Sequence, residues 1–198
     1  MQSKDTIDRN FWVMASLESI KQGILAAKNE LLAALSPEAL MAGADIAALV
    51  ENRIVSTGTD STGKRLSPYS TKELPAFFYF GRSRNQKGEA AVRKKAKQGA
   101  GVSYREFRQF NGLNVSNKNL EFTGEMWQGF GVVGAVSLSP GIVEVTIGGK
   151  NQRTRQLLGY HSEREGTNVT APSNAELQAV SAGISARLVA IIQKNLSK

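Results

Sequence analysis

The feature that most constrains the fold is a long amphipathic repeat near the N-terminus. Between Phe11 and Leu35, apolar residues recur at steps of three and four, which predicts a helix with one apolar face. These residues are Val13, Leu17, Ile20, Ile24, Ala27, Leu31 and Leu35. Charged residues such as Glu18, Lys21 and Lys28 interrupt the pattern, so we expect neither a signal peptide nor a membrane span.

A second helix is predicted directly after the first. Ser36, Pro37 and Glu38 stand in the order of an N-cap, a first-turn proline and a first-turn acid. They predict a helix from about Pro37 to about Val55. Its inner face is made of small residues, which let another backbone approach closely: Ala39, Ala42, Gly43, Ala44, Ala47 and Ala48.

The stretch "TDSTGKRLSPYST", from Thr59 to Thr71, predicts an ordered loop with two turns. Asp60, Gly63 and Pro68 favour turns by side-chain bonding, free φ and fixed φ, respectively. We expect Gly63 and Pro68 to set these turns, and thereby to place Tyr69 and the following run "PAFFYF" against the sheet of the predicted hairpin. The role predicted for Gly63, Pro68 and Tyr69 is therefore structural.

A β-hairpin is predicted after Leu120. Two apolar, β-branched runs are joined by Ser139-Pro140-Gly141, which is a turn signal. In the second run Val143, Val145 and Ile147 alternate with other residues, so one face of the sheet is expected to be buried and one wet.

The C-terminal region predicts one more helix. Ser173 and Glu176 have the spacing of a capping box, and an apolar stripe follows them. The stripe consists of Leu177, Val180, Ile184, Leu188 and Ile191. The order of helices, strands and helix predicts an α+β fold, with N-terminal helices and a C-terminal helix packed on one face of a small antiparallel β-sheet.

Composition bounds the domain number and the chemistry. A chain of 198 residues with 41% hydrophobic content favours a single domain over residues 1–198. Cysteine is absent, which excludes disulfides, thiolate metal sites and a cysteine nucleophile. The net charge of +8 favours contact with nucleic acid or an acidic protein surface.

Nearly all of this charge lies in one segment. Between Arg82 and Arg108 the sequence has nine basic and two acidic residues, a net charge of +7. The basic residues are Arg82, Arg84, Lys87, Arg93, Lys94, Lys95, Lys97, Arg105 and Arg108. With few apolar residues to bury, the segment predicts a mobile basic arm at about residues 82–103.

Two interpretations of this arm stay open. A run of charge is most often a solvated loop. The alternative is contact with nucleic acid, in which the cations hold phosphates while Tyr104, Phe107 and Phe110 stack on bases. Nothing in the sequence indicates a helix-turn-helix or zinc-finger motif that would read a base sequence.

Catalytic, cofactor and metal sites are not indicated. Gly129, Gly131 and Gly134 match G-x-G-x-x-G, but more strand pattern follows, so the glycines predict a bulge or a close backbone approach. His161, the only histidine, stands near Glu163 and Glu165 in a spacing that fits no metal motif. We therefore expect a protein that is not an enzyme.

Three segments resemble the pattern of tailed-phage virion-morphogenesis or tail-completion proteins. The first is Gly63-Lys-Arg-Leu66-Ser-Pro68-Tyr69-Ser-Thr71, which resembles a "G-x-x-W/L-x-P-L/Y-S/T-x-x-T" loop. The second, Leu120-Glu-Phe-Thr123-Gly124-Glu-Met126, resembles the "L-x-x-T/S-G-x-L/M" approach to the hairpin. The third, from Tyr160 to Thr167 with Ala171-Pro172 after it, resembles a "Y-A-x-x-H/Q-x-x-G-T … P-A/x-R" segment. Leu66 stands where an aromatic is common, and no arginine follows Pro172.

The resemblance implies a structural protein of the virion, in the neck or at the tail end, that is made in the host cytoplasm. Such a protein forms a cyclic homo-oligomer, with a hexamer as one candidate, at the head-proximal end of the tail and joins tail to head. Its partners would be copies of itself, neighbouring neck and tail-tube proteins, and the DNA passing through the lumen, with no membrane contact. The alternative function is a free, basic nucleic-acid-binding protein without enzymatic activity.

Overall fold

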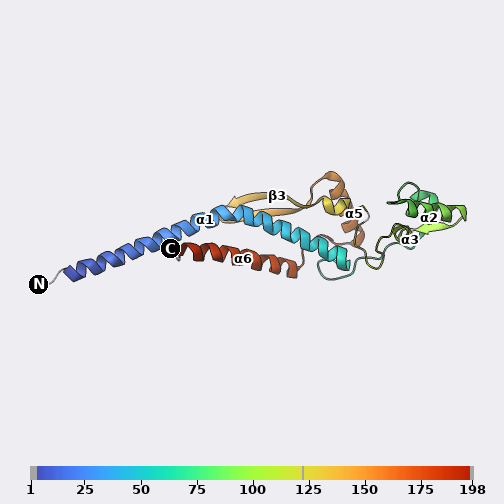
Figure 1. Cartoon of the computed structure of the whole chain (residues 1–198). Coiled ribbons are helices and arrows are strands. Elements are labelled where there is room, and N and C mark those ends of the chain that lie inside the picture. The colour runs from blue at the N-terminus through green and yellow to red at the C-terminus, as the bar shows by residue number, and fades with distance from the viewer. Residues whose placement is uncertain (1–3, 122, 197–198) are drawn as a thin grey trace.

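A single long helix, α1 (Lys4–Thr57), forms the spine of the molecule. The computed structural model describes residues 4–121 and 123–196, and it gives the chain an elongated shape along this helix (Figure 1). Helix α6 (Asn174–Leu196) lies beside α1, and the N-terminal part of α1 extends past it (Figure 1). Small antiparallel sheets complete an α+β architecture, as the sequence predicts.

The predicted break between two N-terminal helices is wrong. Pro37 lies inside α1, where a proline removes one backbone donor and costs about 3 kcal/mol. Helix α6 contacts α1 on both sides of this position. On one side Lys194 Nζ lies 2.7 Å from Glu30 Oε1, and on the other Arg187 Nε lies 2.5 Å from Glu38 Oε2. These contacts also show that α6 runs antiparallel to α1, and its packing outweighs the local cost of the proline.

The predicted hairpin is formed by β3 (Phe130–Ser139) and β4 (Ile142–Gly149), which pair antiparallel and lie against α1. Alternation in β4 is confirmed, because residues 143, 145 and 147 are partly buried and those between them are exposed. Gly43 allows α1 to come close to the sheet: a Cβ there would lie 2.6 Å from Val145 Cγ1. Of the small inner face predicted for this part of α1, Ala42, Gly43 and Ala47 are buried, whereas Ala44 and Ala48 are exposed.

The glycines of the G-x-G-x-x-G pattern mark a bulge and a close approach, as predicted. The pairing register of the hairpin shifts between Val132 and Gly134. At Gly129 a Cβ would lie 2.0 Å from Thr154 Oγ1, so no larger residue fits without a shift of the neighbouring helix. Gly131 has φ of +154°, which is a conformation that side chains other than glycine rarely adopt.

Two short helices flank the hairpin and differ from the prediction. The segment before β3 was predicted as strand, but α4 (Glu125–Gln128) is a helical turn that buries Met126 and Trp127. After β4 comes α5 (Gln152–Glu165), which the sequence did not reveal because its stripe of buried residues is short. Asn151 caps α5 by accepting a hydrogen bond from Thr154 N at 2.8 Å.

The main hydrophobic core lies around the C-terminal half of α1. It gathers residues from α1, α4, α5, β3 and the loops between them: Ala47, Val50, Ile54, Leu66, Leu120, Met126, Trp127, Phe130, Leu158 and Val169. Of the described N-terminal half of α1, only Ala27 is buried before Ala42. The molecule is therefore well packed around the C-terminal half of α1, whereas most described side chains of the N-terminal half are exposed.

A second core defines a small lobe at the far end of the molecule (Figure 1). Five elements build it: β1 (Glu73–Pro75), η1 (Ala76–Tyr79), α2 (Gln86–Lys97), β2 (Gly101–Ser103) and α3 (Tyr104–Phe110). Strand β1 pairs with β2, and the core consists of Ala76, Tyr79, Val92, Val102 and Phe107. We call this unit, from Glu73 to Phe110, the distal lobe, and we call the rest of the described chain the body.

The prediction of a mobile basic arm at about residues 82–103 is wrong for α2 and β2, which are regular elements within the distal lobe. Asn85 caps α2 by accepting from Gly88 N at 2.7 Å, and Ser103 and Glu106 form a capping box for α3. Val92 is fully buried. The charges of α2 lie mostly on its outer face, so a few apolar residues inside are enough to anchor it.

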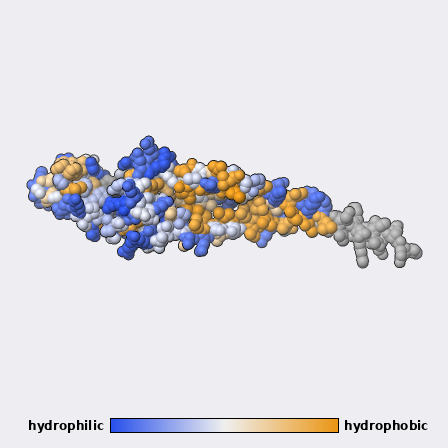
Figure 2. Space-filling view, turned by 180° about the vertical axis from the view of Figure 1, so that it is seen from behind, coloured by the Kyte–Doolittle hydropathy of each residue, from blue (hydrophilic) through white to orange (hydrophobic). Residues whose placement is uncertain are grey.

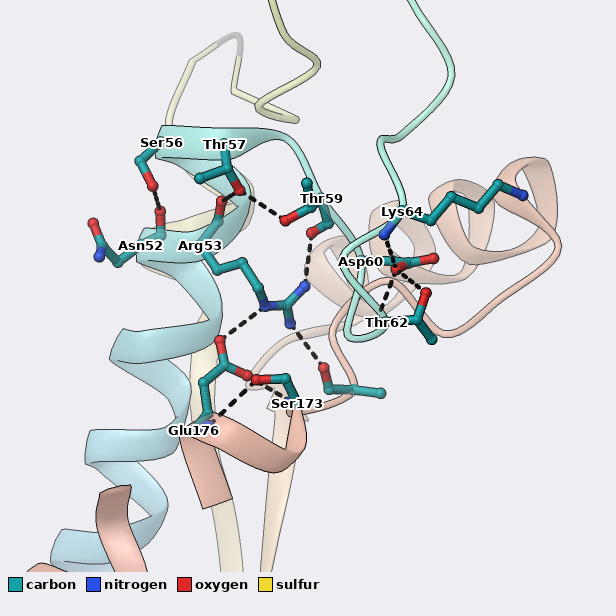
Figure 3. A network of polar contacts seen from close by, with 11 residues as sticks. Asn52, Arg53, Ser56, Thr57, Thr59, Asp60, Thr62, Lys64, Ser173 and Glu176 are labelled. Atoms are coloured by element: carbon teal, nitrogen blue, oxygen red, sulfur yellow. Dashed lines mark hydrogen bonds and ion pairs between the residues drawn. The ribbon is translucent and has the colours of Figure 1, made fainter. Parts of the chain in front are cut away.

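Arg53 ties the end of α1 to the start of α6 (Figure 3). Its guanidinium donates to Glu176 Oε1 at 2.8 Å, to Thr59 O at 2.7 Å and to Ala171 O at 2.8 Å. Glu176 also accepts from Ser173 N at 2.6 Å, which confirms the predicted capping box. Burial acts to raise the pKa of Glu176, but the bonds from Arg53 and Ser173 outweigh it and hold that pKa below its ordinary value.

Replacing Arg53 by lysine is expected to lower the free energy of unfolding by about 2 kcal/mol. A lysine keeps the charge, but its single ammonium nitrogen cannot reach three acceptors that Arg53 meets with three separate nitrogens. Urea unfolding measures the change. The control is Lys28→Arg on the exposed side of α1, for which no loss is expected, and a loss no larger than that of the control would contradict the role given to Arg53.

Candidate functional site

The body of the molecule exposes a large amount of apolar side chain. Figure 2 shows this surface over the half of the molecule that holds the hairpin and the paired helices. We call it the apolar surface. Its members are Leu17, Ile20, Ile24, Leu25, Leu32, Leu40 and Met41 of α1, Val133, Val136, Leu138 and Ile142 of the hairpin, and Leu177, Val189, Ile192 and Leu196 of α6. Monomeric soluble proteins rarely expose so many contiguous apolar side chains.

Part of the apolar surface is hollowed between α1 and α6. A groove of about 360 Å³ lies there, and it is lined by Ile24, Ala27, Leu31 and Leu32 from α1 and by Ile192 and Leu196 from α6, with the stem of Lys28 at its side. Nearly every lining atom is carbon. A groove of this kind binds an apolar side chain rather than a polar ligand.

The hairpin adds open strand edges to the apolar surface. Among the described residues, β3 pairs with β4 and with no other strand, so the outer edge of each strand keeps unpaired backbone groups. Val136 is 61% exposed and Leu138 is 59% exposed. A two-stranded hairpin is marginal by itself, and such edges are where further strands add.

Two helices of the described chain are long and apolar enough to cross a membrane by length and composition. They are the part of α1 from Leu17 to Thr57 and the whole of α6, each of which contains an 18-residue stretch with a mean hydropathy of 1.4. Few of their residues are buried inside the molecule. This is weak evidence for a span, since helices that pack in an assembly have the same composition, and the expectation of no membrane contact stays a prediction.

The nine basic residues predicted to form one contact surface are divided by the structure. Arg108 is 1% exposed and belongs to the interior. Lys95 pairs with Glu106 at 3.2 Å, and Arg93 pairs with Glu89 at 2.8 Å. The other six are exposed, and no carboxylate of the described chain lies within ion-pair distance of them: Arg82, Arg84, Lys87, Lys94, Lys97 and Arg105.

The aromatic residues predicted to accompany these cations are the wrong ones. Phe107 is buried in the core of the distal lobe, and Tyr104 and Phe110 pack against that core. The exposed rings are instead those of Phe77, Phe78 and Phe80. The run "PAFFYF" has four aromatic residues in six positions, which is more than one side of a short segment can bury, and this was the signal in the sequence that could have revealed them.

The loop with Gly63, Pro68 and Tyr69 is ordered, as predicted. Asp60 Oδ1 accepts from Thr62 N at 2.9 Å and from Lys64 N at 3.0 Å (Figure 3), and Gly63 has φ of +84°. Burial acts to raise the pKa of Asp60, but the hydrogen bonds from Thr62 and Lys64 outweigh it and lower that pKa. Pro68 is exposed. The loop does not hold "PAFFYF" against the hairpin, because that run folds into the distal lobe with its own sheet.

Tyr69 lies at the junction between the body and the distal lobe. Its hydroxyl donates to Asn119 Oδ1 at 2.9 Å and accepts from Asn119 N at 3.2 Å. The guanidinium of Arg108 lies over its ring, 4.1 Å from the centroid. Arg108 also donates to Asn119 Oδ1 at 3.0 Å and to Asn114 O at 3.2 Å and 3.1 Å, and it bonds Glu121 O.

A buried ion pair completes this junction. Lys118 Nζ bonds Glu165 Oε1, and the two side chains are 1% and 5% exposed. Glu165 Oε2 accepts from Ser67 N at 2.8 Å. Burial acts to raise the pKa of Glu165, but hydrogen bonds from Lys118 and Ser67 outweigh it, so this pKa lies below its ordinary value. The pair therefore joins three segments that are far apart in the sequence.

His161 lines a cavity of about 230 Å³ beside this junction, together with Tyr69, Arg108 and Lys118. Burial, and then the charges of Lys118 and Arg164, lower the pKa of His161 to about 4, so the imidazole is neutral near pH 7. Its Nδ1 is buried and has no hydrogen-bond partner among the described residues. Within that part of the chain no group of three His, Asp or Glu side chains could hold a metal.

Comparison with protein-family models found no matching family, and comparisons with curated proteins and with solved structures found no similar protein.

Proposed function

We propose that the chain is a structural protein of a tailed phage, in which copies of the subunit form a ring in the neck, at the head-proximal end of the tail, and join tail to head. The observation that carries this proposal is the apolar surface. A subunit alone in water leaves it exposed, whereas a neighbouring copy can cover it. The open edges of β3 and β4 can pair with strands of that neighbour.

The position of the resembling segments supports the same proposal. The loop from Gly63 to Thr71, the stretch from Leu120 to Met126 and the stretch from Tyr160 to Thr167 are distant in sequence. Two kinds of contact join them or their direct neighbours: Tyr69 bonds Asn119, and Glu165 bonds Lys118 and Ser67. Segments that resemble one protein family therefore form one structural unit, which is what a shared fold would require.

A defined oligomer is the expected state of the purified, nuclease-treated protein. Replacing Val136 and Leu138 together by glutamine is expected to weaken this association at least about tenfold, because both side chains are exposed and their burial by a neighbour contributes about 1 kcal/mol or more each. Light scattering coupled to size exclusion measures the mass as a function of concentration. Tyr160→Gln is the control, since Tyr160 is 56% exposed but lies outside the apolar surface.

Four results would contradict parts of the proposal. A monomeric wild-type protein would contradict the proposed assembly. An oligomer that the Val136/Leu138 change leaves intact would place its interface elsewhere. A protein that sediments with membranes and is released only by detergent would assign the apolar surface to lipid. For the role in the neck, electron microscopy of phage carrying the Val136/Leu138 change is expected to show unjoined heads and tails, and joined particles would oppose that role.

A further inference from the structure

The distal lobe has more positive charge than its own folding uses. Between Glu73 and Phe110 it contains nine basic and three acidic residues, a net charge of +6. Two of the basic side chains pair with carboxylates, and Arg108 is buried. The six exposed cations defined above repel one another, which costs stability unless a polyanion neutralises them.

Three of these cations form a stripe on α2. Lys87, Lys94 and Lys97 stand at positions i, i+7 and i+10 of the helix, so they share one face, and all are exposed. The stripe is about 15 Å long, which is the length of roughly four nucleotides of a stacked strand. The buried side of α2 is the opposite one, where Gly88 and Val92 lie.

Exposed aromatic rings stand beside this stripe. Phe77 and Phe78 are 61% and 47% exposed, and their rings stack with centroids 4.7 Å apart. Arg93 of α2 lies over the ring of Phe80, 4.9 Å from its centroid, so the rings and the cationic helix adjoin. Figure 2 shows apolar and hydrophilic surface side by side at this end of the molecule.

A shallow groove lies at the foot of these rings. Its volume is about 540 Å³, and its lining includes Phe77 and Phe80 on one side and Ala96, Gly99 and Ala100 at the end of α2 on the other. Small residues along that side leave room for a flat ring. Glu73 at the rim is the one acidic residue of the lining.

We propose that this surface of the distal lobe binds single-stranded nucleic acid. The lysine stripe holds phosphates, while the phenyl rings stack on bases, a combination that is typical of surfaces which bind single strands without sequence preference. A duplex can use only the cations, because its bases are already stacked inside. The inference does not depend on the proposed assembly, since it concerns the end of the molecule away from the apolar surface.

Fluorescence anisotropy with a 20-nucleotide strand and a duplex of the same sequence tests the proposal. The wild-type protein is expected to bind the strand more tightly than the duplex at equal phosphate concentration. Phe77→Leu with Phe78→Leu keeps apolar bulk but removes the rings, and it is expected to weaken binding of the strand about tenfold while binding of the duplex stays unchanged. Lys87→Gln, Lys94→Gln and Lys97→Gln together are expected to weaken both and to flatten the salt dependence for the strand by about 2.

The matched control replaces three exposed lysines outside the distal lobe, Lys28, Lys64 and Lys150, by glutamine. It removes the same charge and is expected to change binding much less. Equal loss in the control, or equal affinity for strand and duplex with no effect of the phenylalanine changes, would overturn the proposal. So would competition by polyglutamate as strong as that by the strand, which would assign the surface to an acidic protein. Thermal unfolding of each variant verifies that the lobe stays folded.

Discussion

Replacing Glu165 by glutamine is expected to lower the free energy of unfolding by about 3–5 kcal/mol, because Lys118 is left charged and buried without a partner. Both side chains of the pair are nearly inaccessible to water. Glutamine retains an acceptor for Ser67 N and nearly the same volume, so the effect isolates the charge. Guanidinium unfolding at pH 7 measures it.

The dependence of this effect on pH has a defined sign. Because the pKa of Glu165 is lower in the folded protein than in the unfolded chain, its contribution is present above the unfolded pKa, near 4.3, and is lost as the pH falls through the folded pKa. The glutamine variant cannot lose it. The difference in stability between wild type and variant should therefore be largest near pH 7 and should shrink below about pH 4.

The double variant Lys118→Met with Glu165→Met separates the charge from the packing. Apolar side chains of similar length leave no buried charge, so most of the lost stability is expected to return. If the single and the double variants were equally destabilised, the cost would come from packing. If Glu165→Gln lost less than about 1 kcal/mol, the pair would not be buried in solution as it is in the structure.

Hydrophobic periodicity predicted the elements that have a broad apolar stripe. The repeat around Ile20 and Ile24, the stripe of α6 and the alternation of β4 each extend over several turns or residues, and each is found in the structure. The break predicted at Pro37 failed for a physical reason. A proline acts locally, whereas the contacts of α6 on both sides of it come from residues about 150 positions away.

The distal lobe was missed because composition hides it. Helix α2 has one fully buried side chain, Val92, among many lysines and arginines, so its average hydrophobicity is that of a disordered segment. Its narrow stripe of Gly88, Val92 and Ala96 has helical spacing and was the available signal. No pattern in the sequence indicated that Lys118 would be buried, because its burial depends on an ion pair with Glu165 of α5, which is distant in sequence.

The candidate surfaces were only partly predictable. The run of basic residues in the sequence was enough to predict the exposed cations of the distal lobe, because most charged side chains stay at the surface whichever fold forms. Which rings stand beside them depends on how η1 packs on α2, so the sequence analysis named Phe107, which the fold buries, instead of Phe77 and Phe78. The sequence does not predict whether an apolar stripe is covered within the chain, because a stripe such as Leu17, Ile20 and Ile24 has the same spacing whether its partner is the same chain or another.

Arg108 shows the same limit of sequence-based prediction. It was predicted to contact a partner, yet it lies inside the junction between the body and the distal lobe, with its guanidinium over the ring of Tyr69. Its guanidinium serves oxygens of Asn114, Asn119 and Glu121, and within the described chain it has no carboxylate partner. Hydrogen bonds from a charged donor compensate the cost of burying it.

Arg108→Met is expected to lower the free energy of unfolding by about 3 kcal/mol, because three oxygens lose their donor at once. Arg108→Lys should lose nearly as much, since a lysine cannot reproduce the planar fork. Arg105→Met is the matched control: it removes an exposed arginine of the same helix, one turn away, and should change stability by less than about 0.5 kcal/mol. Because the lobe and the body have separate cores, we also expect faster hydrogen exchange in the loop from Asn114 to Asn117 than within either core. Urea unfolding and exchange measured by mass spectrometry test both effects, and an Arg108→Met protein as stable as the control would mean that Arg108 is solvated and free for a partner, as the sequence alone suggests.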